Sequence, residues 1–171
     1  ALSLVGSEMC IRDRALINGE GILVQNYCLT DILSYHAKIN PNKTAYIFLE
    51  KNIEQSLYNY KKLQEEALKI ADYLQEQNFK GERVILLYPS SIDFLIAFLG
   101  CLYAGVIAVP SYAPKNSTSI SRTKTILDDA KPKLIMTNNL YKAEIINLAN
   151  NCRSDAKVIC NEDIILSLIH I

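Results

Sequence analysis

The stretch RVILLYPSSIDFLIAFLGCLYAGVIAVPSY, residues 83–112, decides the fold of this protein. It begins with a short, nearly continuous apolar run, residues 83–88, which is typical of a strand buried on both faces of a parallel sheet. A helix is expected over about residues 91–104, and a second strand over residues 106–109, ended by Pro110. Strand, helix and strand in this order predict a parallel βαβ unit.

The boundaries of this unit carry recognisable signals. Ser90, with Asp93 three residues later, is expected to cap the helix, and Gly105 to end it. Residues 94–109 contain no charged side chain, so a membrane span has to be considered. A bilayer needs about twenty apolar residues, and this run is bracketed by Asp93 and Pro110 and divided by Gly105. We therefore expect a buried core helix and no transmembrane segment.

The same alternation continues towards the C-terminus. A helix with one apolar face is expected next, marked by Ile120, Thr123, Leu127 and Ala130. A strand follows over residues 133–137, a weaker helix over about 141–150, and a last strand over 156–160. Alternating strands and helices predict an α/β fold, an open, mostly parallel sheet with helices on both faces.

A short helix and a histidine are expected near the N-terminus. Thr30 is predicted to cap a helix that runs to about Ile39, with Pro41 just beyond it as a stop signal. His36 lies on the apolar side of this helix, together with Ile32, Leu33 and Ala37. A single histidine in that position is interpreted as a packing residue, not as a ligand.

Two further elements precede the main pattern. Residues 45–49 and 55–58 are predicted to pair as a small antiparallel ribbon. An amphipathic helix follows, with Asn59 as its N-cap and a favourable pair of Glu65 and Lys69 on its solvated side. Its apolar positions step by three and four along Tyr60, Leu63, Ala67, Ile70, Ala71 and Leu74.

Composition excludes several classes of function. Eighteen Lys and Arg balance eighteen Asp and Glu, so the broad positive field needed for nucleic acid is absent and no nucleic-acid partner is expected. The two histidines give little support to a His-based metal site or a Ser-His pair. The cysteines form no CxxC motif, which favours a reducing, cytoplasmic compartment; they are Cys10, Cys28, Cys101, Cys152 and Cys160.

Ligands of open α/β sheets gather outside the carboxyl ends of the strands. In this chain those ends carry hydroxyl and amide side chains, at Pro89-Ser90, Pro110-Ser111-Tyr112 and Thr137-Asn138-Asn139. No strand is followed by a glycine-rich phosphate loop. A binding edge is therefore expected, but no phosphate cradle.

No residue of the chain is predicted to be catalytic or to bind a metal. Asp128 and Asp129 are adjacent on a helix and point in different directions, and they are interpreted, like Glu162 and Asp163, as solvated charges. Cys101 lies within the apolar helix, where burial raises a thiol's pKa, so it is expected to pack as a small hydrophobic residue.

The two ends differ from the middle. Residues 1–14 and residues 166–171 look like translated sequencing adapter, so we expect the native segment to be residues 15–165 of a longer protein. The alternative is that Leu2–Val5 belong to a weak leader, but that apolar run is short and no charged region precedes it.

Four blocks of the chain resemble the N-terminal portion of the AMP-forming acyl-activating enzymes. The blocks, in order, are LSYHAKINPNKTAYIFLE (33–50), LYNYKKLQEEALKIADYLQ (57–75), KGERVILLYPSSIDFLIAFLGCLYAGVIAVPSYAP (80–114) and DDAKPKLIMTN (128–138). Within that superfamily, the third block is most similar to the fatty acyl-AMP ligases. The chain departs from the common pattern at Asn59-Tyr60 and at Ser90-Ser91.

The resemblance implies a parent enzyme that uses ATP and Mg²⁺ to convert a fatty acid into an acyl-adenylate, and then passes the acyl group to an acyl carrier protein. The family's phosphate loop, adenine motif, ribose contact and mobile lysine map to no residue of this chain, so the piece is expected to be inactive and its cofactor-binding residues stay unknown.

The loop Ser111–Ser119 is interpreted as an exposed crossover or as a wall of the site. The alternatives are an acyl-CoA synthetase fragment, a non-catalytic α/β binding module and, least favoured, a membrane-anchored protein.

Overall fold

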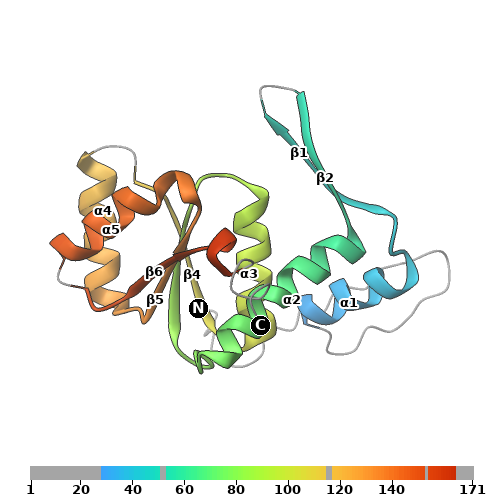
Figure 1. The fold of residues 1–171 in the computed structure, drawn as a ribbon, viewed down its shortest axis with the longest axis horizontal. Coiled ribbons are helices and arrows are strands. Elements are labelled where there is room, and N and C mark those ends of the chain that lie inside the picture. Colours follow the sequence, from blue (N-terminus) through green and yellow to red (C-terminus); the bar gives the residue numbers. More distant parts are fainter. Residues whose placement is uncertain (1–27, 51–52, 115–116, 153, 165–171) are drawn as a thin grey trace, which may run out of the picture.

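The computed structural model describes residues 28–50, 53–114, 117–152 and 154–164 of the chain (Figure 1). A four-stranded parallel sheet lies between helices, and a two-stranded ribbon projects away from it. The elements are α1 Leu29–Ile39, β1 Thr44–Glu50, β2 Ile53–Asn59, α2 Tyr60–Glu76, β3 Arg83–Tyr88, α3 Ile92–Ala104, β4 Ile107–Tyr112, α4 Ser117–Ala130, β5 Leu134–Thr137, α5 Asn139–Asn151 and β6 Lys157–Cys160. The predicted α/β class is confirmed.

The central strand of the sheet is β3. The strand order is β4-β3-β5-β6, all neighbours are parallel, and Val84 lies between Ala108 of β4 and Leu134 of β5. Every residue of 84–88 is at most 1% exposed, as the continuous apolar run predicts.

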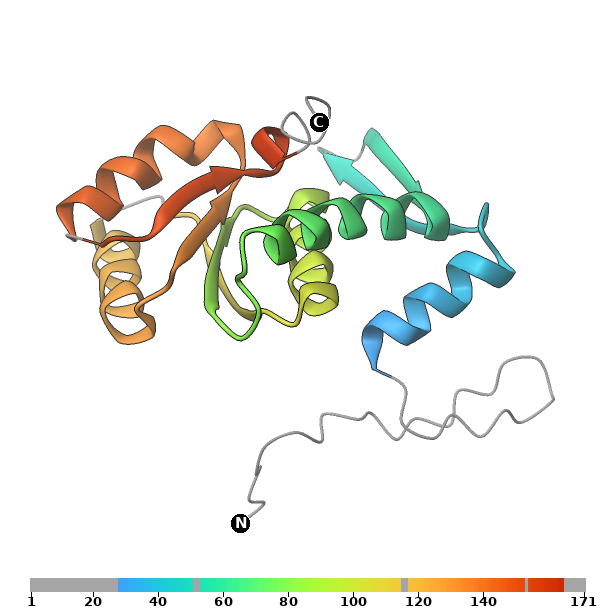
Figure 2. The ribbon, with the colours of Figure 1, turned by 60° about the horizontal axis from the view of Figure 1, so that its bottom comes forward.

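Two hydrophobic cores cover the two faces of the sheet. Because side chains alternate along a strand, Val84, Leu86 and Tyr88 enter one core, while Ile85 and Leu87 enter the other. The first core is completed by α1, α2 and α3, and the second by α4 and α5. Figure 2 shows α2 and α3 on one side of the sheet and α4 and α5 on the other, with α1 lying beyond α2. Helices on both faces confirm the predicted layering.

Helix α3 packs very closely against α2. A methyl group placed at Gly100 would lie 2.6 Å from both Cβ and Cγ2 of Ile70, so glycine at this position permits the contact. Gly105 has φ +68° and ends α3 in the left-handed conformation, as predicted. Within the described residues, no helix is both long and apolar enough to cross a membrane.

Strand β4 corrects one prediction from the sequence. Pro110 does not end the strand; it lies within β4, in register with Leu86 of β3, and the strand continues to Tyr112. The physical reason is the position of β4 at the edge of the described sheet, where a proline's missing N–H can face away from the neighbouring strand.

Two helix caps lie at other residues than predicted. The N-cap of α1 is Cys28, not Thr30, and the Asp31 carboxylate accepts a hydrogen bond from the Cys28 backbone N–H at 3.1 Å. The N-cap of α3 is Ser91, not Ser90, and its hydroxyl accepts from the Phe94 N–H at 3.4 Å. Adjacent residues with capping ability make such positions ambiguous by one or two residues.

The β1–β2 ribbon and the start of α2 agree with prediction. The strands pair antiparallel, and Asn59 caps α2 by accepting a hydrogen bond from the Lys62 N–H at 2.8 Å. The expected Glu65–Lys69 pair is wrong, because Lys69 pairs with Glu66 at 2.8 Å and Glu65 lies 3.9 Å from Lys61. Because α2 carries several Lys and Glu side chains three and four residues apart, the side-chain rotamers decide which lysine pairs with which glutamate.

Candidate functional site

A groove of about 500 Å³ opens at the carboxyl edge of the sheet. It is lined by the strand-end segments Tyr88–Ser90 and Pro110–Tyr112, by Phe94 of α3, and by four residues of α4: Ser119, Arg122, Thr123 and Ile126. Parallel strands bring their carboxyl ends to one edge, so β3 and β4 end side by side there. The two segments lie side by side, as the sequence predicts; that this edge binds a ligand stays a prediction.

The third predicted segment, Thr137-Asn138-Asn139, has a structural role instead. The Thr137 hydroxyl donates to the Leu87 carbonyl at 2.7 Å, and the Asn138 side chain caps α5. Asn139 Oδ1 accepts from Cys160 Sγ at 2.9 Å. None of the three is among the residues that line the groove. Their polar atoms hold β5 and α5 in place.

The loop Ser111–Ser119 lines the groove at both of its ends. Ser111 and Tyr112 contribute from β4, and Ser119 contributes from α4, while residues 115–116 lie outside the described part of the chain. Of the two interpretations of this loop, the structure favours the wall of a site for those terminal residues.

Arg122 is the groove residue that sequence reasoning missed. Among the described lining residues it alone carries a charge, and no carboxylate pairs with it within the described part of the chain. Next to it, the Thr123 hydroxyl donates to the Ser119 carbonyl at 2.9 Å. The sequence pattern that could have pointed to Arg122 is a basic residue near the start of a helix that follows a strand.

A buried hydrogen-bond network holds Tyr88, one of the residues that line the groove. The Tyr88 hydroxyl donates to Asn161 Oδ1 at 2.6 Å, and Asn161 Nδ2 donates to the Asp93 carbonyl at 3.1 Å. Burial, and secondarily the nearby Asp93 carboxylate, raise the pKa of Tyr88 well above its usual value. Burial, and then Glu162, raise the pKa of Asp93. Tyr88 therefore acts as a hydrogen-bond donor that ties β3 to the chain after β6.

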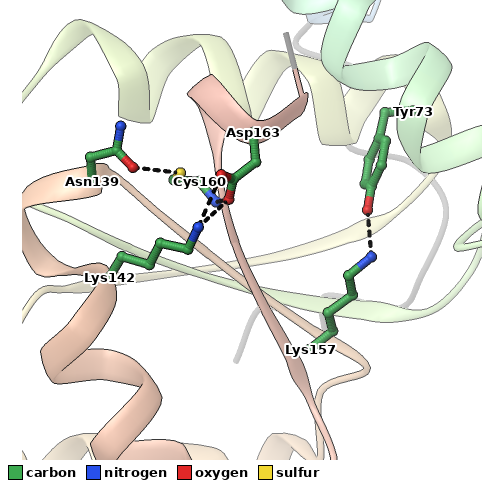
Figure 3. A network of polar contacts seen from close by, with 6 residues as sticks. All are labelled: Tyr73, Asn139, Lys142, Lys157, Cys160 and Asp163. Carbon is green, nitrogen blue, oxygen red and sulfur yellow. Dashed lines mark hydrogen bonds and ion pairs between the residues drawn. The ribbon is translucent and has the colours of Figure 1, made fainter. Parts of the chain in front are cut away.

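Asp163 also differs from its prediction as a solvated charge. It pairs with Lys142 Nζ at 2.7 Å and accepts from the Cys160 N–H at 3.1 Å (Figure 3). Burial acts to raise the pKa of Asp163, but the hydrogen bonds from Cys160 and Lys142 outweigh it and lower the pKa to about 2. In the same view, Lys157 Nζ donates to the Tyr73 hydroxyl at 3.0 Å and joins β6 to α2. These contacts are structural.

The remaining candidates have packing or surface roles. Cys101 is fully buried, and burial raises its pKa to about 12, which fits the predicted inert thiol. His36 stacks on Tyr60 with ring centroids 4.8 Å apart, as expected of a packing residue. Asp128 and Asp129 are exposed, in agreement with prediction.

The described residues offer no cluster of side chains that would hold a metal ion by itself. Divalent cations require several oxygen ligands, and the described part of the chain contains no group of three His, Cys, Asp or Glu side chains that could hold a metal.

Comparison with known proteins places these features in a family. The family model described as AMP-binding enzyme matches residues 33–167. The chain is 38% identical over 114 residues to a medium-chain-fatty-acid–[acyl-carrier-protein] ligase, JamA, of Moorena producens, covering 64% of this chain and 19% of that protein. It is 28% identical over 123 residues to the long-chain-fatty-acid–AMP ligase FadD23 of Mycobacterium tuberculosis, covering 69% of this chain and 21% of that protein.

Solved structures agree with these relatives. A fatty acid AMP ligase from Legionella pneumophila superposes with a TM-score of 0.70 at 32% identity, covering 78% of this chain and 23% of that one. A fatty acyl-adenylate ligase from the same organism, in complex with acyl adenylate and pyrophosphate, has a TM-score of 0.68 at 33% identity, covering 79% and 23%. The chain thus spans about a fifth of the length of its relatives. From the family match and the shared fold, we conclude that the chain belongs to the family of AMP-binding, adenylate-forming enzymes.

Proposed function

We propose that this chain is the N-terminal part of an ATP-dependent fatty acid ligase. In the proposed reaction, the fatty acid carboxylate attacks the α-phosphorus of ATP, the bond to the β-phosphate oxygen breaks, and pyrophosphate leaves. A thiol of an acyl carrier protein then attacks the acyl-adenylate carbonyl and releases AMP. The observation that carries the proposal is the likeness to the Legionella fatty acid AMP ligase over 78% of this chain.

In this proposal the chain supplies a scaffold and no catalytic residue. The α/β layers hold the carboxyl edge of the sheet in place as one wall of a larger site. In the same proposal, residues 15–165 are the native segment. ATP brings Mg²⁺ with it, and the metal is held by polypeptide beyond the described residues, which offer no suitable ligand cluster. The parent enzyme acts in the cytoplasm, since the scattered cysteines form no disulfide among the described residues.

The test uses the complete gene product that contains this sequence. We expect pyrophosphate release that depends on both ATP and a fatty acid, with an acyl-adenylate detectable by mass spectrometry. The 171-residue chain, assayed alone at the same concentration, is expected to release none. A complete gene product that forms no acyl-adenylate with fatty acids of any length would overturn the proposal and leave a non-catalytic binding module.

The acyl acceptor separates two versions of the proposal. A putative fatty-acid–CoA ligase of Mycobacterium tuberculosis, fadD25, is 29% identical over 114 residues, so CoA is the second candidate. The complete enzyme is offered radiolabelled fatty acid, ATP and either CoA or a holo acyl carrier protein. Label on the carrier protein supports the ligase proposed above, and label on CoA alone assigns an acyl-CoA synthetase.

A further inference from the structure

The side chain of Asn161 joins three elements at the carboxyl edge of the sheet. Asn161 directly follows β6. Its Oδ1 accepts a hydrogen bond from the Tyr88 hydroxyl at 2.6 Å, and its Nδ2 donates to the Asp93 carbonyl at 3.1 Å. Because β5 lies between β3 and β6 in the sheet, these contacts cross the end of β5. One side chain therefore connects the end of β6 to the end of β3 and to the first turn of α3.

Both places that Asn161 holds belong to the wall of the groove. Tyr88 lines the groove, and so does Phe94, which follows Asp93 in the first turn of α3. The rings of Tyr88 and Phe94 lie edge to face, with centroids 6.4 Å apart and an angle of 61° between their planes. Asn161 itself is not among the described residues that line the groove. It is therefore placed to act on the groove through Tyr88 and Phe94.

The burial of these groups makes the arrangement of the wall depend on Asn161. Tyr88 is 1% exposed and Asn161 is 5% exposed, so solvent is poorly placed to replace either hydrogen-bond partner. A buried polar group that loses its partner costs free energy, which favours the arrangement in which all of these groups stay paired. Burial also raises the pKa of Tyr88 well above its usual value, so its hydroxyl remains the donor.

We propose that Asn161 is a positioning residue of the parent enzyme: by holding Tyr88 and the first turn of α3, it fixes the wall of the groove against which a substrate binds. The inference rests on the proposed function, because it is the complete ligase that uses this wall. It goes beyond that function by assigning the position of the wall to a side chain outside the groove, 73 positions from Tyr88 in the sequence.

Thr137 offers a matched control. Its hydroxyl is also buried, and it donates to the Leu87 carbonyl at 2.7 Å, from the end of β5 to β3. Thr137 is not among the described residues that line the groove. Tyr88→Phe and Thr137→Val therefore each remove one buried hydroxyl at the same edge of the sheet, and only the first releases a group of the groove wall.

The kinetic test uses the complete gene product that contains this sequence, with pyrophosphate release as the readout. Tyr88→Phe and Asn161→Leu should each raise the KM for ATP or for the fatty acid about threefold or more, because a displaced wall weakens binding. Thr137→Val should leave both KM values within about twofold of the unaltered enzyme. A smaller folded fraction lowers only the apparent kcat, so a rise in KM separates positioning from a loss of stability.

A second measurement needs no turnover. In the 171-residue chain with ¹³C-labelled phenylalanine rings, the signal of Phe94 is assigned by its absence in Phe94→Leu. Asn161→Leu is expected to shift or split this signal, and Thr137→Val is expected to leave it in place. Circular dichroism of each variant verifies that the fold is kept, and Tyr88→Phe, which removes a single oxygen atom, serves in the kinetic test if Asn161→Leu does not fold.

Three results would overturn the proposal: unchanged KM values in Tyr88→Phe and Asn161→Leu, an equal rise in Thr137→Val, or a Phe94 signal that stays in place in Asn161→Leu. An equal rise in the control would mean that any buried hydrogen bond at this edge has the same effect. The two proposals fail in different ways. An unaltered gene product that forms no acyl-adenylate refutes the proposed function, whereas active enzyme whose KM values ignore Asn161 refutes only the positioning role.

Discussion

The central strand β3 and the ribbon strand β1 are both rich in apolar residues, but they are buried very differently. Val84, Leu86 and Leu87 of β3 have no exposed surface, whereas Ile47 and Leu49 of β1 are 52% and 57% exposed. The β3 strand has a neighbour on each side and a helical layer on each face, while β1 pairs only with β2 among the described strands. Apolar composition therefore predicts a strand, but the neighbouring layers decide how much that strand contributes to stability.

The largest expected effect is a truncation in the sheet. Leu86→Ala should lower the free energy of unfolding by about 2–5 kcal/mol, because it leaves a cavity in a close-packed core. Urea denaturation of the 171-residue chain measures the change. A loss below about 1 kcal/mol would mean that the core closes around the missing atoms, and the contrast between β3 and β1 would then be wrong.

The next effect tests the contact between α2 and α3. Gly100→Ala should destabilise by about 1–3 kcal/mol, since the new methyl group overlaps Ile70. The combined variant Gly100→Ala with Ile70→Ala should be less destabilised than the sum of the two single variants, as a double-mutant cycle would show. Additive losses would indicate that the helices shift apart and that the close approach is not required.

A smaller, pH-dependent effect on stability is expected from Asp163, which follows the edge strand β6. The folded-state pKa of Asp163, about 2, lies below its ordinary value of 3.8, so its contribution is present above about pH 4 and is lost as the pH falls towards 2. Because the pair with Lys142 is partly exposed to solvent, we expect a contribution of about 1 kcal/mol or less. Thermal melts at a series of pH values should show that Asp163→Asn removes part of this acid sensitivity. The exposed Asp129→Asn is the control and should leave the profile unchanged.

The smallest effect is expected in the ribbon. Ile47→Ser should change the free energy of unfolding by less than about 0.5 kcal/mol, because the side chain is already half exposed. The same urea experiment as for Leu86→Ala makes the two values directly comparable. A loss of 2 kcal/mol or more, roughly that of a buried residue, would show that the ribbon is packed in solution against something the described residues do not include.

Periodicity was sufficient to predict most of the fold. The apolar run of 83–88, the stepped apolar face from Tyr60 and the left-handed Gly105 each specify their own element through local geometry. Two predictions were wrong because they depend on neighbouring structure. Pro110 does not end β4, because the strand lies at an edge of the sheet, and Lys69 pairs with Glu66, because more than one carboxylate is within its reach. Two of the three predicted strand-end segments, those after β3 and β4, line the groove, since parallel strands end at one edge.

The site residues required the folded chain. Arg122 becomes a candidate only when α4 is packed beside the ends of β3 and β4, and Asp163 changes from a surface charge to a paired one only when α5 brings Lys142 to it. The amino-acid order specified the elements and their succession, because hydrophobic period and capping act over a few neighbouring residues. Which side chains meet was decided by packing between elements distant in the sequence, since those contacts depend on layer order and register that local patterns do not encode.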